Sequence, residues 1–589
     1  MRVPNSSKPT VLSDALWVFP KVNKELSSKL ALEVGISENL AQILTSREIT
    51  TKESIEKFIS IDFDKRHDPF LLKGMQESVE RIHKSIQNGE KIGVYSDYDV
   101  DGISGAAVLH HFFKDIEINC VTIIPDRNDE IYGMTIDHIK RFQEADVSLI
   151  ITVDCGISSA KAVNFSQQEG IDVIITDHHQ LPAVLPKASS IIHPFQEGCN
   201  YPFKFLSGVG LAFKLAEACK LFLENAPDFS KELPDLRKYS GYVALGTVAD
   251  VVPLTDENRV LVANGLKEIT KGTCKGLELL KKVASLERKD IVVNDLAFKI
   301  NPKINTPGKI DHADKSFRLL TEDNEELLLP IVEDIKELNQ KRQTLQGKAL
   351  HEAHEMIERT INLNNSNVIV LASENWHTGV LGSIATRLVD RYNRPTILLH
   401  ISKKGFAKGS GRSIPAYNLF EGLRKNSHLI NAYGGHKFAV GLSIDADKVD
   451  VFRKALNKTV MADLSPLELT PRIRVDLELG FEKIESVFFK EISLLAPFGV
   501  GNPTPVLYNK NVWIYEEPKR LGKRGEHVSI ELHDGQDSLT VIGYYMSDFF
   551  DDFDWEGNSF EVLFSPILNS LNKRESIRFF LRKIRPYNQ

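Results

Sequence analysis

The sequence lacks the features of membrane-embedded and secreted proteins. None of its apolar runs approaches the ~18 residues that a bilayer-spanning helix needs. Residues 1–20 also lack the basic flank and apolar core of a secretory signal. The remaining composition is ordinary for a globular protein, with 42% hydrophobic and 26% charged residues. We therefore expect a protein that is neither integral to a membrane nor exported.

Cysteine and excess positive charge are also missing. The chain has five cysteines among 589 residues, and none of them form a CxxC pair. Scattered thiols in odd number argue against a disulfide framework or structural zinc, and they favour the cytoplasm. The net charge of −7 does not indicate a nucleic-acid binder, so such a partner would need local basic patches.

The length exceeds what one hydrophobic core supports and predicts three or four structural units. In the first third, near-continuous apolar segments such as 146–153 and 171–176 alternate with helix-like spacers such as 158–170. This pattern predicts a parallel sheet with both faces covered. After the first strand, Gly102 and Gly105 are expected to form a tight turn into a helix over 106–113.

Each predicted strand ends in side chains that can bind metal. The segments KIGVYSDYDVDGISG, DVSLIITVDCGIS and IDVIITDHH all have this form, and YVALGTVADVVPL adds a buried segment that stops at an aspartate. Functional groups collect beyond the carboxyl ends of such strands, so these side chains should converge. They are Asp97, Asp99, Asp101, Asp154, Asp177, His178, His179 and Asp250.

This set of side chains predicts a site for hard divalent cations. Carboxylates suit Mg²⁺ and Mn²⁺, and an imidazole favours Mn²⁺. Acidic groups crowded together repel one another unless cations lie between them. Two ions ~3.5–4 Å apart would clamp a phosphoryl group and activate water. We therefore expect a two-metal phosphodiesterase or pyrophosphatase.

The motifs DYDVDG, VDCG, DHH and VADVVPL, in this order, resemble the DHH phosphoesterase superfamily. That superfamily includes RecJ exonucleases, nano-RNases, cyclic-dinucleotide phosphodiesterases and pyrophosphatases. The resemblance implies that the metal ligands are Asp99, Asp101, Asp154, His178 and Asp250. It places Asp97 beside them, makes Asp177 a ligand or an orienting group, and directs His179 to the scissile phosphate or the metals. Many relatives have histidine in place of Tyr95, so we expect a weaker first metal site here.

The middle of the chain resembles the same superfamily, and the RecJ family in particular. A long amphipathic helix is predicted over 324–360, and the Gly-rich GFAKGSGRS and AYGGHKFAVGL follow it. These two Gly-rich segments resemble the DHH-associated domain. The segments WHTGVLG and NPKINTPGKID resemble RecJ motifs. Lys303 and Lys309 replace the usual arginines and lose the bidentate fork. The implied substrate-binding residues are Asn305, His377, Ser410, Gly411, Arg412, Gly434, Gly435 and His436.

The last ~120 residues alternate apolar and polar positions at hairpin spacing, which predicts a β domain. Its basic residues and the aromatic residues Trp513, Tyr515, Phe579 and Phe580 would suit an OB-fold groove for single strands. The alternative is a solvated basic rim around core aromatics. LAPFGVGNPTPVL resembles the entry to the RecJ OB domain and favours the groove. The predicted groove cations are Lys519, Arg520, Lys523, Arg524, Arg582 and Lys583, with Lys573 and Arg574 nearby.

The resemblance implies an α/β protein in which a DHH parallel-sheet domain and a DHH-associated domain are joined by a long helix and followed by an OB-fold. The expected limits are 1–60 for an N-terminal extension, 61–320, 321–362 for the helix, 363–462 and 463–589. Removing residues beyond about 463 is expected to leave the catalytic core folded.

The implied function is that of a cytoplasmic, two-metal Mn²⁺ or Mg²⁺ exonuclease that degrades single-stranded DNA 5′→3′ to mononucleotides in repair and recombination. A single-strand-binding protein and a helicase are candidate partners of the expected monomer. Two alternatives remain: a DHH oligonucleotide or cyclic-dinucleotide phosphodiesterase, and a non-catalytic single-strand-binding replication factor.

Overall fold

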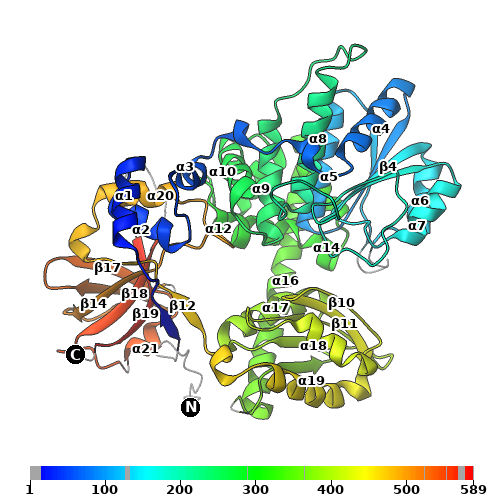
Figure 1. The fold of residues 1–589 in the computed structure, drawn as a ribbon. Helices are drawn as coiled ribbons and strands as arrows, with labels where there is room; N and C mark the ends of the chain where they lie inside the picture. The colour runs from blue at the N-terminus through cyan, green and yellow to red at the C-terminus, as the bar shows by residue number, and fades with distance from the viewer. Residues whose placement is uncertain are drawn as a thin grey trace. The chain divides into compact units, whose positions relative to one another are not determined.

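The computed structural model describes residues 15–126, 133–287, 290–363, 365–522, 524–551, 553–567 and 578–587. The chain forms two compact units. Unit 2 contains Glu53–Gln340 and Leu494–Pro503, and unit 1 contains Met1–Lys52, Lys341–Ser493 and Thr504–Gln589. The division falls within helix α16 (Glu325–Thr360), which is the long amphipathic helix that the sequence predicts (Figure 1).

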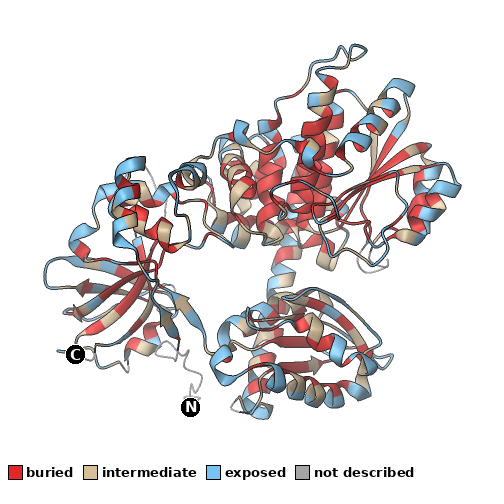
Figure 2. Cartoon of the chain, viewed as in Figure 1, coloured by how far each residue is buried: buried red, intermediate tan, exposed pale blue. Residues whose placement is uncertain are grey.

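A five-stranded, all-parallel sheet lies at the centre of unit 2, with strand order β3-β2-β4-β5-β6. The strands are β2 (Lys91–Ser96), β3 (Cys120–Ile123), β4 (Val147–Val153), β5 (Asp172–Thr176) and β6 (Ser190–Ile192). Strands β2, β4 and β5 are buried along nearly their whole length, as Figure 2 shows in red. The predicted parallel sheet is confirmed.

Helices cover both faces of this sheet, which explains its continuous apolar strands. Val94 and Ile151 point to the face packed by α4 (Met75–Asn88), α5 (Val100–Asp115) and α8 (Gly208–Leu223). Tyr95 and Ile150 point to the face packed by α6 (Ile136–Glu144) and α7 (Ala160–Gln168). Neighbouring residues of one strand therefore stabilise opposite layers.

The predicted turn after β2 is wrong. Helix α5 begins at Val100, so Gly102 and Gly105 lie inside the helix rather than before it. A Cβ on Gly102 would come within 2.5 Å of the Asp97 carbonyl oxygen, and one on Gly105 within 2.5 Å of the Val153 side chain. These glycines let α5 pack closely beneath the ends of the strands.

The rest of unit 2 is helical. Helix α9 (Ser240–Ala249) packs against α5, α8 and α10 (Asp256–Lys271). Further helical elements include α3 (Lys52–Ile59), α11 (Lys275–Val283), α12 (Val293–Asp295), a π-helix (Leu296–Ile300), α13 (Asn301–Ile304), α14 (Pro307–Ile310) and α15 (Asp314–Thr321). The short segment Leu494–Pro503, from the LAPFGVGNPTPVL motif, completes this unit rather than the β domain.

Unit 1 contains a second α/β layer with strand order β10-β11-β9-β8-β7. The strands are β7 (Ile369–Ser373), β8 (Thr396–Ile401), β9 (Phe406–Arg412), β10 (Ala432–Gly435) and β11 (Ala439–Asp445). Helix α17 (Thr378–Tyr392) packs with the C-terminal part of α16 on one face. Helices α18 (Leu419–Lys425) and α19 (Val449–Asp463) pack on the other.

A closed five-stranded barrel forms the C-terminal part of unit 1. Its strands follow the order β14-β18-β19-β17-β16, and pairing between β16 and β14 closes it. They are β14 (Leu507–Ile514), β16 (His527–His533), β17 (Ser538–Gly543), β18 (Phe560–Ile567) and β19 (Arg578–Pro586). This closed barrel confirms the predicted OB-fold. Two short strands, β13 (Leu477–Glu478) and β15 (Lys519–Leu521), extend the sheet.

The N-terminal segment is part of the same unit. Strand β1 (Leu16–Val18) pairs in parallel with β12 (Arg472–Arg474), and helices α1 (Lys24–Val34) and α2 (Glu38–Ser46) follow it. The buried Arg47 Nε lies 3.0 Å from Asp476 Oδ1, and the Arg585 guanidinium lies 3.8 Å from the centre of a Trp17 ring. Residues 15–47 therefore stabilise the barrel end of unit 1.

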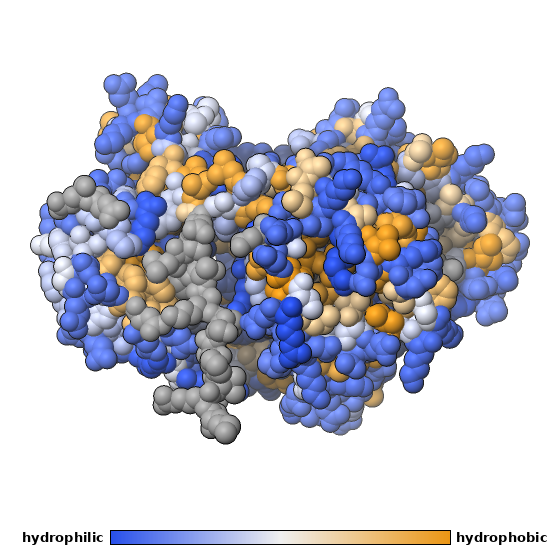
Figure 3. Space-filling model, turned by 90° about the horizontal axis from the view of Figure 1, so that it is seen from below, coloured by the Kyte–Doolittle hydropathy of each residue, from blue (hydrophilic) through white to orange (hydrophobic). Residues whose placement is uncertain are grey.

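Among the described residues, no helix has an apolar stretch long enough to cross a membrane. On the face shown in Figure 3, hydrophilic residues surround separate groups of hydrophobic ones. Isolated exposed apolar side chains of this kind are normal on protein surfaces.

Candidate metal centre

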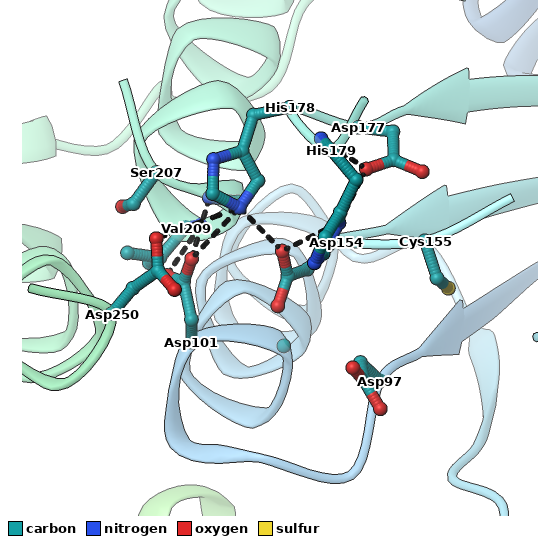
Figure 4. A network of polar contacts seen from close by, with 12 residues as sticks. Asp97, Asp101, Asp154, Cys155, Asp177, His178, His179, Ser207, Val209 and Asp250 are labelled. Atoms are coloured by element: carbon teal, nitrogen blue, oxygen red, sulfur yellow. Dashed lines mark hydrogen bonds and ion pairs between the residues drawn. The ribbon is translucent and has the colours of Figure 1, made fainter. Parts of the chain in front are cut away.

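The predicted ligands meet at the carboxyl edge of the parallel sheet in unit 2. Asp97 follows β2, Asp154 follows β4, and His178 and His179 follow β5. Asp250 caps the C-terminus of α9. Figure 4 shows His178 pointing toward carboxylates that come from three different elements. The predicted convergence is confirmed, because parallel strands end at one edge.

The ligand atoms fall into three overlapping sets, and within each set they lie within 4.8 Å of one another. The sets are Asp97, Asp99 and Asp154; Asp101, His178 and Asp250; and Asp154, His178 and His179. Asp154 and His178 each belong to two sets. Among the described residues, the three sets therefore overlap at Asp154 and His178.

His178 lies at the centre of the cluster. Its Nε2 is 3.0 Å from Asp154 Oδ1, 3.6 Å from Asp250 Oδ2 and 3.8 Å from Asp101 Oδ2. Asp154 Oδ1 is buried and accepts no hydrogen bond from a described residue. A buried carboxylate oxygen without a donor is costly in a protein interior unless a cation satisfies it. This arrangement fits a divalent metal.

Asp101 is held by the N-terminus of helix α8. The backbone N–H groups of Gly208 and Val209 donate to its carboxylate at 2.6 and 2.9 Å. Helix N-termini stabilise negative charge, so this contact fixes an acidic ligand in place. A Cβ on Gly246 would lie 2.5 Å from Asp101 Oδ1, so the opposite wall of the site admits no side chain there.

Asp154 sits on a strained backbone. Its φ of +62° is uncommon for a residue other than glycine, and such strain persists where the surroundings hold it. Its N–H donates to the Thr176 carbonyl at 3.0 Å, which continues the ladder beyond β4. A Cβ on Gly208 would lie 2.4 Å from Asp154 Cβ. Close packing and the sheet thus fix this side chain.

Burial and mutual repulsion raise the pKa values of the clustered carboxyl groups. The pKa of Asp97 and that of Asp101 rise to about 7, through burial first and the nearby Asp99 second. Burial and the charge of Asp101 raise the pKa values of Asp154 and Asp250 well above the ordinary range. A cation that binds here therefore displaces protons as well as relieving repulsion.

Asp177 orients His179. Its Oδ1 lies 2.8 Å from His179 Nδ1, and its Oδ2 accepts the Ile157 N–H at 3.0 Å. Burial opposes charge on both groups. Their mutual hydrogen bond outweighs it, lowering the pKa of Asp177 to about 2 and raising that of His179 to about 9. Asp177 belongs to none of the three sets among the described residues, so the geometry fits orientation better than metal binding.

The Tyr95 side chain lies on the face of the sheet that α6 and α7 cover. Its hydroxyl donates to the Gly133 carbonyl at 3.1 Å, and its ring centre is 4.8 Å from that of His138. It is fully buried in the layer formed with α6 and α7. This position supplies packing rather than an imidazole to the site.

The sequence reading missed the residues that hold the ligands. Ser207 caps α8, Gly208 and Val209 supply the amides, and Gly246 leaves room for Asp101. The segment SGVG directly before the apolar LAFKLA carries the signal: a serine N-cap followed by small residues at the start of a buried helix. Nothing in that signal indicates which carboxylate the helix contacts.

The Gly-rich GFAKGSGRS contains the central strand β9, which is paired on both sides. A Cβ on Gly409 would lie 2.0 Å from the Leu398 carbonyl oxygen, so packing explains this glycine. Ser410 and Gly434 share one row of the sheet through Gly441.

The other predicted substrate-binding residues lie mostly near these strands. Arg412 Nη1 donates to the Gly411 carbonyl at 2.8 Å, and a Cβ on Gly382 of α17 would lie 2.9 Å from Arg412 Nη2. His377 caps α17, and its Nδ1 accepts the Gly379 N–H at 3.1 Å. Two further predicted residues lie at the end of β10: Gly435 (φ +124°) is its last residue, and His436 follows and donates its N–H to the Ala439 carbonyl at 2.8 Å. Asn305 belongs to unit 2, where it ends α13.

The predicted groove cations that the structure describes lie on β15, just beyond β15, and on β19. Lys519 and Arg520 lie on β15, where they pair with Glu516 and Asp551, and Arg524 is exposed just beyond it. Arg582 and Lys583 lie on β19. Arg582 Nε donates to Ser565 Oγ at 2.9 Å, and burial lowers the pKa of this guanidinium. Lys523, Lys573 and Arg574 lie outside the described residues.

The predicted interleaved aromatics also divide. Phe579 is buried inside the barrel, where its ring centre lies 5.6 Å from that of Phe564, so its predicted place in a stacking surface is wrong. Phe580 is half-buried beneath the Arg582 guanidinium at 4.5 Å, and Trp513 is also half-buried. Tyr515 is exposed. Burial alternates along a strand, and the sequence does not show which neighbour faces inward.

Family models match three segments of the chain. They are the DHH family, N-terminal domain, over residues 91–247; the DHHA1 domain over 365–462; and the RecJ OB domain over 475–583. Fold and site together thus define a protein of the DHH class. The chain belongs, within this class, to the RecJ family.

Curated relatives of the chain carry the name single-stranded-DNA-specific exonuclease RecJ. The one from Bacillus subtilis is 36% identical over 529 residues, which are 90% of this chain and 65% of the relative. The chain therefore spans slightly less than two thirds of that relative's length. The one from Thermus thermophilus is 30% identical over 504 residues, covering 85% of this chain and 69% of the relative.

Solved structures agree with this assignment. The crystal structure of RecJ from Thermus thermophilus in complex with Mn²⁺ matches with a TM-score of 0.80 and 26% identity. The match covers 98% of this chain and 80% of that one. The same protein in complex with Mg²⁺ matches with a TM-score of 0.75 and 26% identity, covering 98% and 79%.

Proposed function

We propose that this protein is a metal-dependent exonuclease that hydrolyses single-stranded DNA from its 5′ end to mononucleotides. The main support is the convergence of carboxylates and imidazoles around Asp154 and His178 in a chain of the RecJ family. The 5′ polarity and the preference for DNA rest on the family resemblance. Roles in DNA repair and recombination follow from that activity.

We propose two neighbouring metal positions with Asp154 between them, because Asp154 belongs to one set with Asp97 and Asp99 and to another with His178. Asp97, Asp99 and Asp154 would hold one Mn²⁺ or Mg²⁺ ion, and Asp101, His178 and Asp250 would hold the other. Bound ions supply a water of lowered pKa and neutralise phosphate charge. The chain itself contributes rigid carboxylates, because the sheet, Gly208 and the start of α8 hold them before substrate arrives.

His179 would act on the substrate rather than as an essential ligand. Asp177 fixes the orientation of the ring through its hydrogen bond to Nδ1. An N–H donor at this edge suits a nonbridging phosphate oxygen and the charge that develops in hydrolysis.

Other predicted residues would bind the strand. We propose that Asn305, His377, Ser410, Gly411, Arg412, Gly434, Gly435 and His436 contact phosphates near the scissile bond. The barrel cations would bind the single strand further along. The support is that Ser410 and Gly434 share one row of their sheet and that Arg412 lies beside α17.

The remaining proposals concern organisation and setting. We keep the domain limits 61–320, 321–362, 363–462 and 463–589, preceded by an extension over 1–60. We propose that the protein is a monomer and that it works in the cytoplasm. The five cysteines support this location, because all of them are free thiols, as in a reducing compartment. Single-strand-binding protein and a helicase are the proposed partners.

Digestion of 5′- and 3′-end-labelled oligonucleotides tests the function. We expect Mn²⁺- or Mg²⁺-dependent release of mononucleotides from the 5′ end of single-stranded DNA, and none with EDTA. Strong activity on a trinucleotide with none on a strand of about 50 nucleotides would support an oligonucleotide phosphodiesterase instead. Strand binding without metal-dependent cleavage would support a non-catalytic replication factor.

A further inference from the structure

The segment Leu494–Pro503 forms a closed, rigid loop. The backbone groups of Gly499 and Asn502 hydrogen-bond to each other in both directions, at 2.9 and 3.2 Å. Asn502 is 1% exposed, and its side-chain amide donates to the Leu495 and Pro497 carbonyls at 2.7 and 2.9 Å. Because its polar groups hydrogen-bond across the loop, Leu494–Pro503 can act as one rigid unit.

This loop docks against the chain that leaves the metal centre. The Leu254 N–H, four residues after Asp250, donates to the Val500 carbonyl at 2.7 Å. A Cβ on Gly499 would lie 2.6 Å from Leu254 Cδ1, and one on Gly501 (φ +73°) would lie 3.1 Å from Pro253 Cβ. The contact is so close that these two positions have little or no room for a side chain.

Arg259 of helix α10 binds two backbone carbonyls of the loop. This residue is only 2% exposed, and its Nη2 donates to the Leu494 and Ala496 carbonyls at 2.6 and 2.7 Å. Its guanidinium lies 4.7 Å from the centre of the Phe58 ring. Burial lowers the pKa of Arg259 to about 10, so it remains charged at neutral pH.

A buried guanidinium is a costly way to fill space. Arg259 Nε and Nη1 find no acceptor among the described residues, whereas an apolar side chain of similar length would carry no desolvation cost. The arginine supplies what an apolar residue would not: one group that holds two carbonyls of the loop at once.

The backbone between Asp250 and α10 is strained. Val251, directly after Asp250, has a φ of +62°, which is a rare conformation for a β-branched residue. Such a residue keeps this conformation only where its surroundings enforce it. Asn258 Nδ2 donates to the Pro253 carbonyl at 3.0 Å from one side, and the loop binds Leu254 from the other.

We propose that Arg259 and the loop Leu494–Pro503 are positioning elements of the metal centre. They hold the strained turn after Asp250, and so they place the Asp250 carboxylate beside His178 and Asp101. The inference rests on the proposed role of Asp250 as a metal ligand. A segment just before the first barrel strand is thereby part of the metal centre.

Arg259→Met, which removes the two donors but keeps the length, tests the inference. The matched control is Arg66→Met, because Arg66 is an arginine of unit 2 whose side chain is only 10% exposed and pairs with Glu217. We expect the Mn²⁺ binding midpoint to rise about 10- to 100-fold in Arg259→Met and to change less than about twofold in the control. Equal midpoints in the two variants, or no Mn²⁺ binding by the wild-type protein, would overturn the proposal.

A double-mutant cycle separates positioning from general destabilisation. If Arg259 acts through Asp250, adding Arg259→Met to Asp250→Ala should weaken Mn²⁺ binding by less than about twofold. Full additivity of the two changes would contradict the inference. Gly499→Ala replaces Arg259→Met if the latter does not fold, since its Cβ presses on Leu254 from the other side of the contact.

Hydrogen exchange of the metal-free protein gives a readout that is independent of both metal and DNA. In Arg259→Met the Leu254 amide should exchange at least about 10-fold faster than in Arg66→Met. Unchanged protection of the Leu254 amide would count against the proposed positioning role of Arg259. A wild-type protein that binds Mn²⁺ but cleaves no DNA would defeat the proposed function and leave this inference standing.

Discussion

The metal centre and the basic residues of the barrel differ in how tightly the structure holds them. Asp101 and Asp154 are 1% and 2% exposed, and each is fixed by backbone contacts. Lys519 and Arg520 have side chains that are 75% and 48% exposed, and each pairs with a neighbouring carboxylate. Uncompensated charge in the interior is costly, whereas exposed pairs contribute little. Buried acidic groups therefore point to a ligand more strongly than exposed basic ones do.

The largest expected effect is at the metal centre. Asp154→Ala removes the ligand shared by two sets and should lower nuclease turnover by more than about 100-fold. The metal-free variant should be at least as stable as the wild-type protein, because a repelling carboxyl group is lost. Thermal unfolding in EDTA and single-strand digestion measure both. Asp137→Ala, whose side chain is 88% exposed on α6, is the control. Residual activity above a tenth would contradict a bridging role.

The two histidines should differ in kind. His178 contacts three carboxylates, so His178→Ala should raise the Mn²⁺ midpoint by about 10-fold or more. His179 is held by Asp177, so His179→Ala should lower turnover with a change in midpoint below about threefold. Metal titrations and turnover at saturating Mn²⁺ check the division. Equal midpoints for the two variants would remove it.

The metal-free protein should lose stability as the pH rises. The pKa values of Asp97 and Asp101 are about 7 in the folded protein and about 4 in an unfolded chain. A raised folded pKa contributes stability that is full below pH 4 and is lost as the pH rises through 7. The raised pKa of His179 acts in the same direction above about pH 6.5.

Unfolding in EDTA and in Mn²⁺ across this range checks the expectation. The melting temperature in EDTA should fall between about pH 4 and 7, and the gain from Mn²⁺ should grow over the same interval. Asp97→Asn should flatten both curves. A melting temperature in EDTA that rises across this window would show that repulsion between the carboxylates is not felt.

The smallest effects should come from the barrel. Lys519→Ala and Arg524→Ala should each reduce the salt slope of long-strand binding by at most about 0.7, the value for one phosphate contact. Cleavage of a trinucleotide should change little. Lys29→Ala, whose side chain is 70% exposed on α1, is the control. An unchanged slope in both barrel variants would mean that these cations form a solvated rim.

The structure changes one expectation about the barrel. Truncation near residue 463 does not remove the barrel alone, because Leu494–Pro503 belongs to unit 2 and contacts the turn after Asp250. Such a truncation would impair the metal centre as well as strand binding. Point variants on β15 separate the two functions better.

What the sequence predicts well depends on periodic, buried elements. Apolar strands ending in Asp154 and in His178 could be located, because a parallel sheet brings strand ends together. The residues that hold each predicted ligand could not be located in this way, since the contact between Asp101 and Gly208 joins residues far apart in the chain. Gly102 misled, because it serves close packing inside a helix rather than a turn before it. Whether a glycine marks a turn or a close contact depends on neighbours that pattern alone does not show.

The pairing of β1 with β12 has a consequence for synthesis of the chain. Ser37 and Glu491 hydrogen-bond within unit 1 although 454 residues separate them. At about 5–20 residues per second, a ribosome needs on the order of 20–90 s to make that interval. The N-terminal strand must wait through this time while unit 2 emerges and begins to fold. Unit 1, which holds the start of the sequence, is therefore completed last.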